Sequence, residues 1–508
     1  MERQSRPEPV SPPRVRCQAR SLAGGVVAIS LAWLAACGGG SQAPVADTAE
    51  ARGQVLYSVT GVNCVQCHGD PATLRRGAAD APALADRITS AIDRNVGRMG
   101  EAQYGYRNLS SNQLLDISAY LIGQAPAGTP PPGGNNPPAV ATQCVSTGAS
   151  SVRTEVFRTG LSSPWAMAFL PDGRLLVTQK AGSMRIVGAD GTSSDPVSWG
   201  QPAPAILDAG QGGLLDVLLD PDFATTSWVY FTYQEPGPDN TAGTAVGRAR
   251  LQGSTLSDFQ RIYQQVPKGG RGGVHFGSRL AFGSDRTLFV SLGDRGFDDP
   301  GNPTLLHAQH LGNTLGKVIR IHRDGSVPSD NPFVGQVGAR PEIWSYGHRN
   351  PQGLSFDPAS GALWSSEHGP QGGDELNRVL PGANHGWPVR SYGCPYGAPP
   401  GGACRVGGGA HQPLDGRTFT EPVTFWAPTS MAPSNLMVYR GTGFPEWNGQ
   451  LFLGALSGQQ LWRITLAAGA FASCEAIPMN RRIRDVRQGP DGGIWLLADN
   501  GEILRVVR

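Results

Sequence analysis

The stretch "AMAFLPDGRLLVTQ", residues 166–179, consists of an apolar run, a Pro-Asp-Gly turn and a second strand-like run. Pro, Asp and Gly are residues that tight turns favour, so the stretch predicts two antiparallel strands joined by a hairpin. The same order of strand, turn and strand recurs at 278–294, 353–369, 448–466 and 485–507. Such self-similarity is typical of a β-propeller, in which each blade is a small antiparallel sheet.

The repeats fill the chain from about residue 145 to residue 508, and we expect them to form one domain, 145–508. At about 50–60 residues per four-stranded blade, this length predicts an all-β propeller of six blades. An array of β-sandwiches is the alternative architecture. The chain has 508 residues with 70 glycines and 42 prolines, which favours more than one domain and many turns.

A Pro/Gly-rich linker, residues 125–144, separates the repeats from residues 51–124, which we expect to form a small all-α unit. This unit contains "CVQCH", in which Cys64 and Cys67 have the spacing that attaches haem c and His68 follows as an iron ligand. A redox or zinc motif is the alternative for an isolated C-x-x-C. The compartment indicated by the N-terminus favours haem.

Met99 is the candidate for the sixth iron ligand, because it is the only methionine between residues 40 and 160. A thioether ligand raises the potential of a haem. The alternative is a buried core methionine beside an iron with another or no sixth ligand. The segment after Met99, "LSSNQLLDISAYLIG" at 109–123, resembles the C-terminal helix of class I cytochromes c.

The N-terminus has the features of an export signal. Basic residues precede an apolar segment at 21–36, which is long enough for a signal peptide and short for a membrane-spanning helix. The segment ends at Cys37 and resembles the lipobox of bacterial lipoproteins, so we expect signal peptide and lipobox at 1–37 and a tether at 38–50. No aspartate follows Cys37, so we expect a periplasmic protein with a lipid anchor in the outer membrane. An ordinary cleaved signal or a membrane anchor is the alternative.

Four of the eight cysteines are left after export, lipid attachment and haem attachment, and disulfides persist outside the cytoplasm. Cys394 and Cys404 flank a Gly/Pro-rich loop and form a natural local pair. Cys144 and Cys474 would then join the start of the large domain to its end. The sequence leaves this connectivity open.

Charge and motif content exclude several classes of function. The formal net charge is +2 and the body of the chain has no Lys/Arg block, so we expect no nucleic-acid partner. No G-x-G-x-x-G motif opens a βαβ unit, which argues against a nicotinamide or flavin site. No H-E-x-x-H motif indicates a transition-metal site.

Polar side chains gather instead in five short stretches: "GGVHFGSRL", "SLGDRG", "YGHRNPQGLSFD", "SSEHGPQGGDELN" and "NRRIRDV". Together with "NHGWP" at 384–388, they resemble the glucose/sorbosone dehydrogenase family, whose soluble-type quinoproteins bind pyrroloquinoline quinone (PQQ). The resemblance covers nearly all of 150–508 and is strongest to the aldose sugar dehydrogenases. It implies a six-bladed propeller that oxidises sugars.

The resemblance implies three catalytic residues. His275 falls where the family has its general base, a role that suits a neutral imidazole. Asp294 would orient His275 and stabilise its charged form. Arg349 would stabilise negative charge on the quinone as it is reduced.

The resemblance also implies the cofactor contacts. PQQ carries three carboxylates and an ortho-quinone, which bidentate cations recognise well. The matching PQQ-binding positions are Gln211, Arg349, Asn350, Ser430, Arg482 and Arg484. Calcium would bind PQQ through the carbonyls of Gly369 and Pro370, and Glu375 matches a ligand of a second calcium, consistent with the preference of calcium for oxygen.

Some positions depart from the glucose dehydrogenases of the family. His368 replaces a glutamine, His385 replaces a tyrosine, and Ser457 replaces a lysine that contacts PQQ. These departures leave the substrate more open than the cofactor.

The resemblance therefore predicts PQQ-dependent oxidation of an aldose sugar, or a related alcohol or aldehyde, by hydride transfer. We expect the electrons to leave through the fused haem c to an external acceptor, such as a cytochrome or the respiratory chain. One alternative is a calcium-dependent hydrolytic propeller of the lactonase type. Another is a non-catalytic propeller that docks a partner to the cytochrome.

Overall fold

The computed structural model describes residues 141–148, 150–270, 273–298, 306–394, 396 and 419–508. All of them belong to one compact unit, Ala127–Arg508. The predictions for the signal peptide, Cys37, the tether and the haem unit with Cys64, Cys67, His68 and Met99 lie outside the described residues. Among the residues that are described, no helix is long and apolar enough to cross a membrane.

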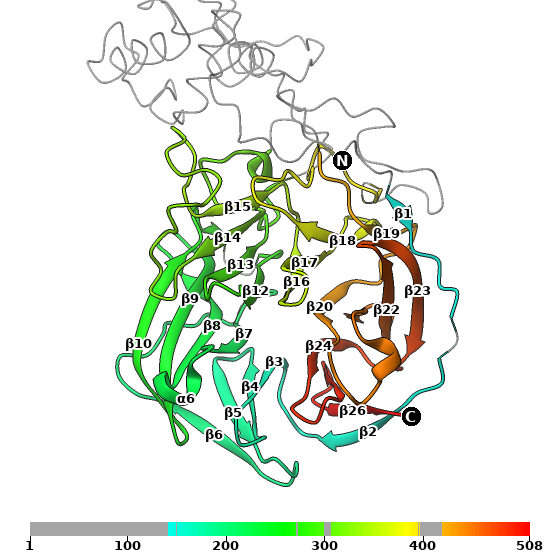
Figure 1. Cartoon of the computed structure of the whole chain (residues 1–508). Coiled ribbons are helices and arrows are strands. Elements are labelled where there is room, and N and C mark those ends of the chain that lie inside the picture. The colour runs from blue at the N-terminus through cyan, green and yellow to red at the C-terminus, as the bar shows by residue number, and fades with distance from the viewer. Residues whose placement is uncertain (1–140, 149, 271–272, 299–305, 395, 397–418) are drawn as a thin grey trace, which may run out of the picture. The chain divides into compact units, whose positions relative to one another are not determined.

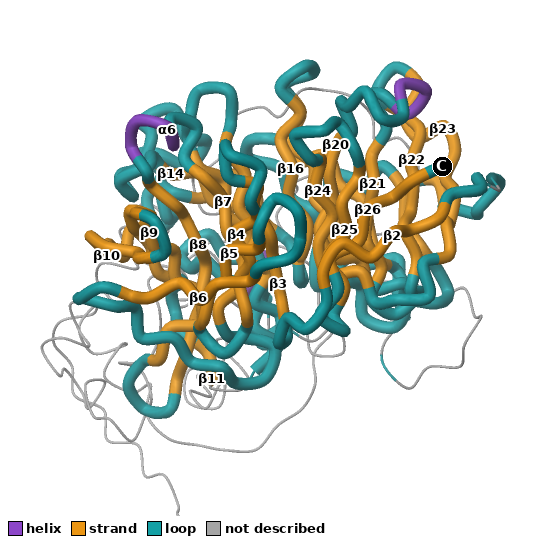
Figure 2. The backbone as a smooth tube through the Cα atoms, turned by 90° about the horizontal axis from the view of Figure 1, so that it is seen from below, coloured by secondary structure: helices purple, strands orange, loops and turns teal. Residues whose placement is uncertain are grey.

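Strands joined by short loops make up most of the described chain (Figure 2). The hairpin predicted at 166–179 is present as β3 (Pro164–Phe169) and β4 (Leu175–Gln179). In its turn, the Leu170 amide donates to the Arg174 carbonyl over 2.7 Å, and Gly173 has a φ of +85°. A glycine suits this turn because L side chains rarely adopt positive φ.

The largest sheet contains two antiparallel sets that meet where β6 pairs in parallel with β10. The first set begins with β3 and β4 and continues with β5 (Ser183–Val187) and β6 (Ser194–Trp199). The second set comprises β7 (Leu214–Leu219), β8 (Trp228–Pro236), β9 (Thr241–Gln252) and β10 (Thr255–Gln264), with β11 (Gly269–Gly270) beside β9. A short helix, α6 (Phe223–Thr226), lies between β7 and β8.

Two further sheets follow along the chain. One comprises β12 (Gly277–Phe282), β13 (Leu288–Leu292), β14 (Lys317–Ile321) and β15 (Ile343–Tyr346), with the 3-10 turn η5 (His307–Gln309) before β14. The other comprises β16 (Pro351–Asp357), β17 (Ala362–Glu367), β18 (Asp374–Val379), β19 (Thr424–Trp426) and β1 (Thr142–Gln143).

The last two sheets contain the C-terminal strands. One comprises β20 (Pro433–Val438), β21 (Leu451–Ala455), β22 (Gln460–Ala467) and β23 (Ala470–Pro478), with η6 (Pro445–Trp447) after β20. The other comprises β24 (Ile483–Gln488), β25 (Ile494–Ala498), β26 (Ile503–Val507) and, at its outer edge, β2 (Arg153–Arg158). An early strand thus completes the sheet made by the end of the chain.

The sheets follow one another in a propeller-like ring (Figure 1). The first strand of each antiparallel set contacts the first strands of its two neighbours, and β24 contacts β3 to close the cycle. These inner strands are β3, β7, β12, β16, β20 and β24. Apolar clusters fill the spaces between successive sheets, for example around Leu215, Phe231 and Ala245. Burial of apolar surface between sheets is the main favourable term for such a fold.

A buried ion cluster, formed by Asp216, Arg279, Asp485 and Arg487, joins the inner strands. Arg279 Nη1 lies 3.0 Å from Asp216 Oδ1 and 3.3 Å from Asp485 Oδ1. Arg487 contacts the same two carboxylates at 2.8 and 3.0 Å. Their oxygens also accept hydrogen bonds from the amides of Met167 and Leu280.

Arg279 has an acceptor for each of its nitrogens. Besides the two carboxylates at Nη1, its Nε donates to the Gln352 carbonyl at 3.0 Å, and its Nη2 lies 3.4 Å from the Arg484 carbonyl. Asn435, on β20, donates to Asp485 over 2.7 Å. The cluster therefore connects residues of every inner strand, and its buried charges are paired, as such charges must be.

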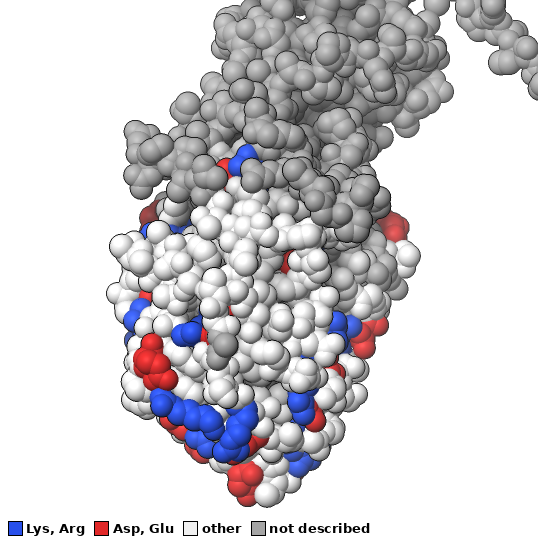
Figure 3. Space-filling view, turned by 90° about the vertical axis from the view of Figure 1, so that its right-hand side faces the viewer, with Lys and Arg blue, Asp and Glu red and all other residues white. Residues whose placement is uncertain are grey.

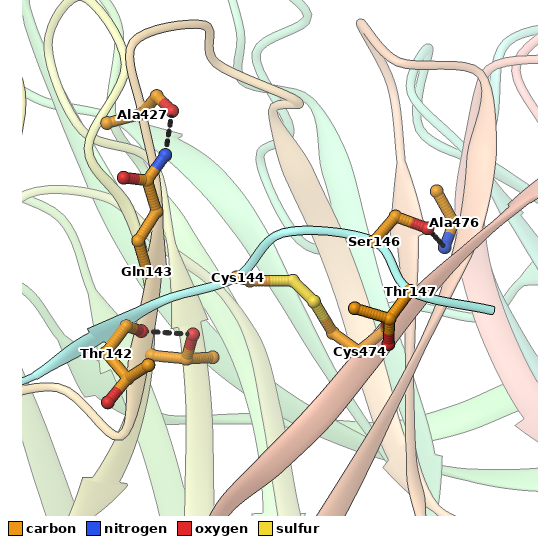
Figure 4. The surroundings of a disulfide bond; sticks show 9 residues. Thr142, Gln143, Cys144, Ser146, Thr147, Ala427, Cys474 and Ala476 are labelled. Atoms are coloured by element: carbon orange, nitrogen blue, oxygen red, sulfur yellow. Dashed lines mark hydrogen bonds between the residues drawn. A yellow bond between two sulfur atoms is a disulfide. The ribbon is translucent and has the colours of Figure 1, made fainter.

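A strap at the N-terminal edge of the described unit, residues 141–148, holds the entering chain across two sheets (Figure 4). Thr142 and Gln143 pair with β19, and a disulfide joins Cys144 to Cys474 on β23, 330 residues away. This confirms the predicted Cys144–Cys474 pair. Cys394 is also disulfide-bonded, and its predicted partner, Cys404, lies outside the described residues.

Acidic and basic side chains lie mostly beside one another on the face drawn in Figure 3, with wide uncharged areas between them. Exposed pairs such as Arg153–Glu155 and Arg508–Glu446 are of this kind.

Candidate active site

The site begins at His275, in the loop before β12. His275 has a φ of +55°, and its side chain is 14% exposed, so the ring is partly open to the solvent. A Cβ added to Gly293 would lie 2.0 Å from the His275 carbonyl oxygen. Glycine is needed at position 293 because the loop that carries Asp294 passes directly against the backbone of His275.

Asp294 is fully buried and holds the imidazole of His275. Its Oδ1 lies 2.6 Å from His275 Nδ1, and its Oδ2 accepts a hydrogen bond from Trp387 Nε1 at 2.7 Å. A carboxylate only accepts, so Nδ1 donates its hydrogen and the lone pair of the imidazole is on Nε2. This arrangement fits a general base, as predicted for His275 and Asp294.

Gln211 contacts the backbone of the same loop. Its Oε1 accepts a hydrogen bond from the His275 amide at 2.9 Å. The side chain therefore helps to hold the loop, in addition to the cofactor contact that the sequence implied. The Gln211 amide in turn donates to the Gly273 carbonyl at 3.2 Å.

Arg349 and Asn350 lie next to this pair. The Asp294 amide donates to the Arg349 carbonyl at 2.8 Å, and the Gly277 amide donates to Asn350 Oδ1 at 3.2 Å. Arg349 Nη1 donates to the Gly369 carbonyl at 2.8 Å, and Nη2 donates to the Tyr396 hydroxyl at 3.0 Å. The structure thus brings together the base, its carboxylate and the first two predicted PQQ contacts.

Two donors in this group have no partner among the described residues. Arg349 Nε and Asn350 Nδ2 are buried, and neither makes a hydrogen bond. An unpaired buried donor is costly unless a ligand satisfies it. A carbonyl or carboxylate oxygen is the complementary group, so the residues present fit the carboxylates and quinone of PQQ.

Arg482 and Arg484 form a second part of the site around Asp499. Asp499 Oδ1 lies 2.8 Å from Arg484 Nε, and its Oδ2 lies 3.0 Å from Arg482 Nε. These contacts lower the pKa of the Asp499 carboxyl, although burial acts in the opposite direction. Arg484 is mostly buried whereas half of the Arg482 side chain is exposed, so Arg484 is the better-positioned cation.

His368 lies among these cations. Its Nε2 donates to the Pro433 carbonyl at 2.7 Å. Burial lowers the pKa of His368 to about 3, and the positive charges of Arg349 and Arg484 act in the same direction. The ring is therefore neutral at physiological pH. His275, Arg349 and Arg484 all lie near His368, so the Arg484 part of the site is close to the His275 part.

The Ser430 hydroxyl lies against the Asp374 carboxylate. Its Oγ donates to both oxygens of Asp374, at 2.9 and 2.7 Å. Asp374 also accepts from the amides of Gly369, Met431 and Ala432. Asp374 is a clamp between two loops of the site, and its burial raises its pKa to about 6.

The predicted calcium ligands at PQQ, Gly369 and Pro370, are buried next to Arg349. No group of three His, Cys, Asp or Glu side chains in the described ranges could hold a metal. A metal here would have to bind backbone carbonyls, which fits the hard-oxygen preference of calcium. The Gly369 carbonyl already accepts from Arg349, so the two cations would share this oxygen.

Glu375, the predicted ligand of a second calcium, is buried opposite Glu367 in the register of β17 and β18. Burial and the neighbouring Glu367 carboxylate raise the pKa of Glu375 well above its usual range. Asn377 donates to both carboxylates, and its own Oδ1 is buried without a partner in the described part of the chain. This set of oxygens suits a hard cation.

Several residues that fix side chains or loops of the site were not predicted from the sequence. Trp387 fixes Asp294, Asp499 fixes the two arginines, and Asp374 fixes the loops at Gly369 and Ser430. The signal for Trp387 was its place in "NHGWP", two residues after His385. His385 itself is buried against His348, with ring centroids 4.4 Å apart, and burial lowers its pKa well below the usual value.

The ring of sheets and this site define the class of protein. The described residues form a propeller-like ring that carries a carboxylate-held histidine beside unpaired arginine and amide donors, an arrangement suited to proton removal next to an oxygen-rich ligand. Residues 161–505 match the Glucose / Sorbosone dehydrogenase family. The chain belongs to this family.

Curated relatives resemble most of the described unit. The chain is 40% identical over 366 residues to aldose sugar dehydrogenase YliI of Escherichia coli (strain K12), which covers 70% of this chain and 93% of that protein. It is 26% identical over 457 residues to quinoprotein glucose dehydrogenase B of Acinetobacter calcoaceticus, covering 77% and 91% respectively.

Solved structures show the same likeness. The soluble aldose sugar dehydrogenase of Escherichia coli, in its apo form, has 38% identity and a TM-score of 0.61, with 70% of this chain and 99% of that chain covered. The PQQ-bound aldose sugar dehydrogenase of Streptomyces coelicolor has 28% identity and a TM-score of 0.56, with 71% and 99% covered.

Proposed function

We propose that this protein is a PQQ-dependent dehydrogenase that oxidises an aldose sugar or a related alcohol or aldehyde. The observation that carries the proposal is the His275–Asp294 pair, placed directly beside the unpaired donors of Arg349 and Asn350. Its relatives include an aldose sugar dehydrogenase and a quinoprotein glucose dehydrogenase, and a PQQ-bound structure is among its structural neighbours.

PQQ, when bound, supplies the two-electron acceptor for the hydride of the substrate. His275 Nε2 removes the proton from the substrate hydroxyl, because Nδ1 already donates to Asp294. Asp294 keeps the ring oriented and stabilises the imidazolium that results. Arg349 Nε and Asn350 Nδ2 offer their unpaired hydrogens to the oxygens of the acceptor, and Arg349 favours the negative charge that develops there.

The other predicted residues would hold the cofactor. Arg484 and Arg482, held by Asp499, would bind its carboxylates, and Gln211 and Ser430 would make further polar contacts with it. The carbonyls of Gly369 and Pro370 would bind a calcium ion at PQQ, and Glu375 would bind a second calcium. We further propose that the sheets form six blades, because only two residue pairs join β6 to β10 in the largest sheet.

The electrons would leave through a haem c in residues 51–124. Cys64 and Cys67 would attach this haem, and His68 and Met99 would ligate its iron. A lipid at Cys37 would anchor the protein to the periplasmic side of the outer membrane. The linker at 125–144 would raise the effective concentration of the haem near the site, which replaces a diffusing acceptor.

The test uses the full-length protein without quinone. PQQ and calcium are added, then a panel of aldoses and simple alcohols, and reduction of the haem is followed by its α-band. We expect reduction only when quinone, calcium and an aldose are all present. Quinone binding without reduction of either the haem or an added dye by any sugar or alcohol would overturn the proposal.

A dye acceptor separates the two halves of the proposal. Dye reduction without haem reduction would show that the dehydrogenase is present and that the internal transfer to the haem is wrong. Hydrolysis of lactones by the calcium-loaded protein, without quinone, would instead support a hydrolytic propeller.

A further inference from the structure

Lys317, at the start of β14, is a buried cation that the proposed reaction does not use. Its side chain is fully buried, and it pairs across the sheet with Leu292, two residues before Asp294. Its ammonium group donates to three backbone carbonyls, those of His307, Ala308 and Leu315, at 3.1, 2.9 and 2.6 Å. An apolar side chain would avoid the cost of burying this charge, so its presence calls for a compensating role.

The carbonyls that bind Lys317 belong to a turn that also contacts the site. The Ala308 carbonyl accepts a second hydrogen bond, from the Gly347 amide at 3.0 Å, two residues before Arg349. Asp298 accepts hydrogen bonds from the amides of His307 and Ala308, both at 2.6 Å. Lys317 therefore lies under the two loops that carry Asp294 and Arg349.

Two buried carboxylates face Lys317, Asp294 and Asp298. His307 lies beside Asp298, with its Nδ1 2.9 Å from Asp298 Oδ1. Burial lowers the pKa of Lys317 to about 7, and the two negative charges act in the opposite direction. Without the ammonium, two carboxylates would lie close together in a low-dielectric region with less positive charge to balance them.

Other charged or titratable groups also lie around the His275–Asp294 pair. Arg295 lies beside Asp294, and burial lowers its pKa to about 10. His368 lies near His275, Arg349 and Arg484. Lys317 differs from Arg295 and Arg349 because its charged group is paired with three backbone carbonyls, whereas theirs keep unpaired nitrogens among the described residues.

We propose that Lys317 is a positioning residue, an internal cation that balances Asp294 and Asp298 and thereby weakens the stabilisation by Asp294 of a proton on His275. The role of His275 as a base rests on the proposed function, whereas the electrostatic effect on its ring does not. Removal of the ammonium leaves the negative charge of Asp294 less compensated, so the electrostatic potential at His275 becomes more negative. The imidazolium is then stabilised, and the ring holds its proton to higher pH.

The test follows the ring of His275 directly by NMR, in full-length protein without quinone and with 15N-labelled histidine. The chain has nine histidines, and the His275→Ala variant identifies the resonance. In Lys317→Met, we expect the midpoint of the His275 titration to rise by about 0.5–1, from a unit charge removed at several ångströms in a partly buried region. An unchanged or lowered midpoint would overturn the proposal.

Arg320→Met is the matched control. Arg320 is a buried cation on the same strand, but it pairs with Asp285 and Asp330, away from the site. We expect no change in the His275 midpoint for this variant, even if it is less stable. An equal change in both variants would mean that any loosening of β14 moves the titration, and would overturn a specific role for Lys317.

Chemical rescue provides a second measurement. Lys317→Ala leaves a space lined by the carbonyls of His307, Ala308 and Leu315. We expect propylammonium to restore the His275 midpoint of this variant, whereas uncharged propanol does not. Failure of every small ammonium ion, in a variant that is folded by circular dichroism, would argue against an internal cation.

The two proposals fail separately. If the chain oxidises sugars, the acid limb of kcat/KM should move upward in Lys317→Met together with the NMR midpoint. If the NMR midpoint moves but no sugar is oxidised by the wild-type protein, the electrostatic role stands and the proposed function is wrong. If sugars are oxidised and neither measurement moves, the inference about Lys317 is wrong.

Discussion

Two arginine-rich regions on the inner strands differ in what their arginines do. In the buried ion cluster, each nitrogen of Arg279 has a protein acceptor, and Arg487 spans Asp216 and Asp485. In the site, Arg349 is almost as deeply buried, yet its Nε makes no hydrogen bond with the described residues. The neighbouring Asn350 also has a free donor.

Burial and charge therefore do not separate a structural arginine from a ligand-binding one in this fold. The difference is whether the protein itself satisfies the donors. A fully paired cluster contributes to folding and excludes ligands, whereas unpaired donors cost stability until a ligand arrives. Variants that change one region at a time should therefore separate effects on stability from effects on activity.

The largest effect is expected for His275, in the site with the unpaired donors. His275→Ala removes the acceptor for the substrate proton and should lower kcat/KM for the best sugar by about 10²–10⁴-fold. Quinone binding and the free energy of unfolding should stay near the wild-type values. Steady-state kinetics with a dye acceptor checks the first point and urea unfolding the second. Full activity in this variant would break the assignment of His275.

Variants of the buried ion cluster should show the opposite response, a loss of stability with little loss of activity. Arg279→Met leaves Asp216 and Asp485 with one arginine instead of two, and should lower the free energy of unfolding by about 3–5 kcal/mol. Urea unfolding followed by circular dichroism measures this change. The quinone-loaded activity per folded molecule should stay close to wild type. A stable but inactive variant would show that the cluster belongs to the site.

Arg349→Met, in the site, is the counterpart of Arg279→Met in the buried ion cluster. We expect kcat to fall by about 10²–10³-fold, because a donor to the developing charge is lost. The free energy of unfolding should fall less than in Arg279→Met, because this side chain loses hydrogen bonds to the Gly369 carbonyl and the Tyr396 hydroxyl but leaves no buried carboxylate without its cation. A large loss of stability with normal activity would place Arg349 with the structural arginines.

The smallest effect concerns Lys317, whose ammonium group is paired with three backbone carbonyls next to the loops of the site. Its pKa in the folded protein, about 7, is below the usual value of 10.5. Between these values the unfolded chain binds the proton more tightly, so stability rises with pH, by at most about 1.4 kcal/mol per pH unit. Urea unfolding from pH 7 to 9 should show this rise in the wild type and a flatter profile in Lys317→Met. Identical slopes would contradict it.

The sequence predicted the local parts of this molecule well. The hairpin at 166–179 follows from turn chemistry within one short stretch, and the structure confirms it as β3 and β4. The site residues in dense motifs were also predicted, and the structure brings His275, Asp294, Arg349 and Asn350 together. Motif spacing carries this information because each motif spans one end of a strand and the adjoining loop.

Contacts between distant segments could not be predicted in the same way. The residues around Asp499 do not show that it will meet Arg484, because Asp499 lies in the turn after β25 and the contact depends on the register of β25 with β24. The contact between Ser430 and Asp374, which lie 56 residues apart, was likewise not predicted. Arg482 was given equal weight with Arg484, but half of its side chain is exposed.

The disulfide between Cys144 and Cys474 has a mechanical consequence. The strand that completes the ring, β2, follows Cys144 along the chain and forms the outer edge of its sheet, where it pairs with β26. A pull on the chain upstream of Cys144 reaches β23 through a covalent bond before it can reach β2. The edge that would otherwise peel first is thus isolated from tension, and the ring stays closed under load.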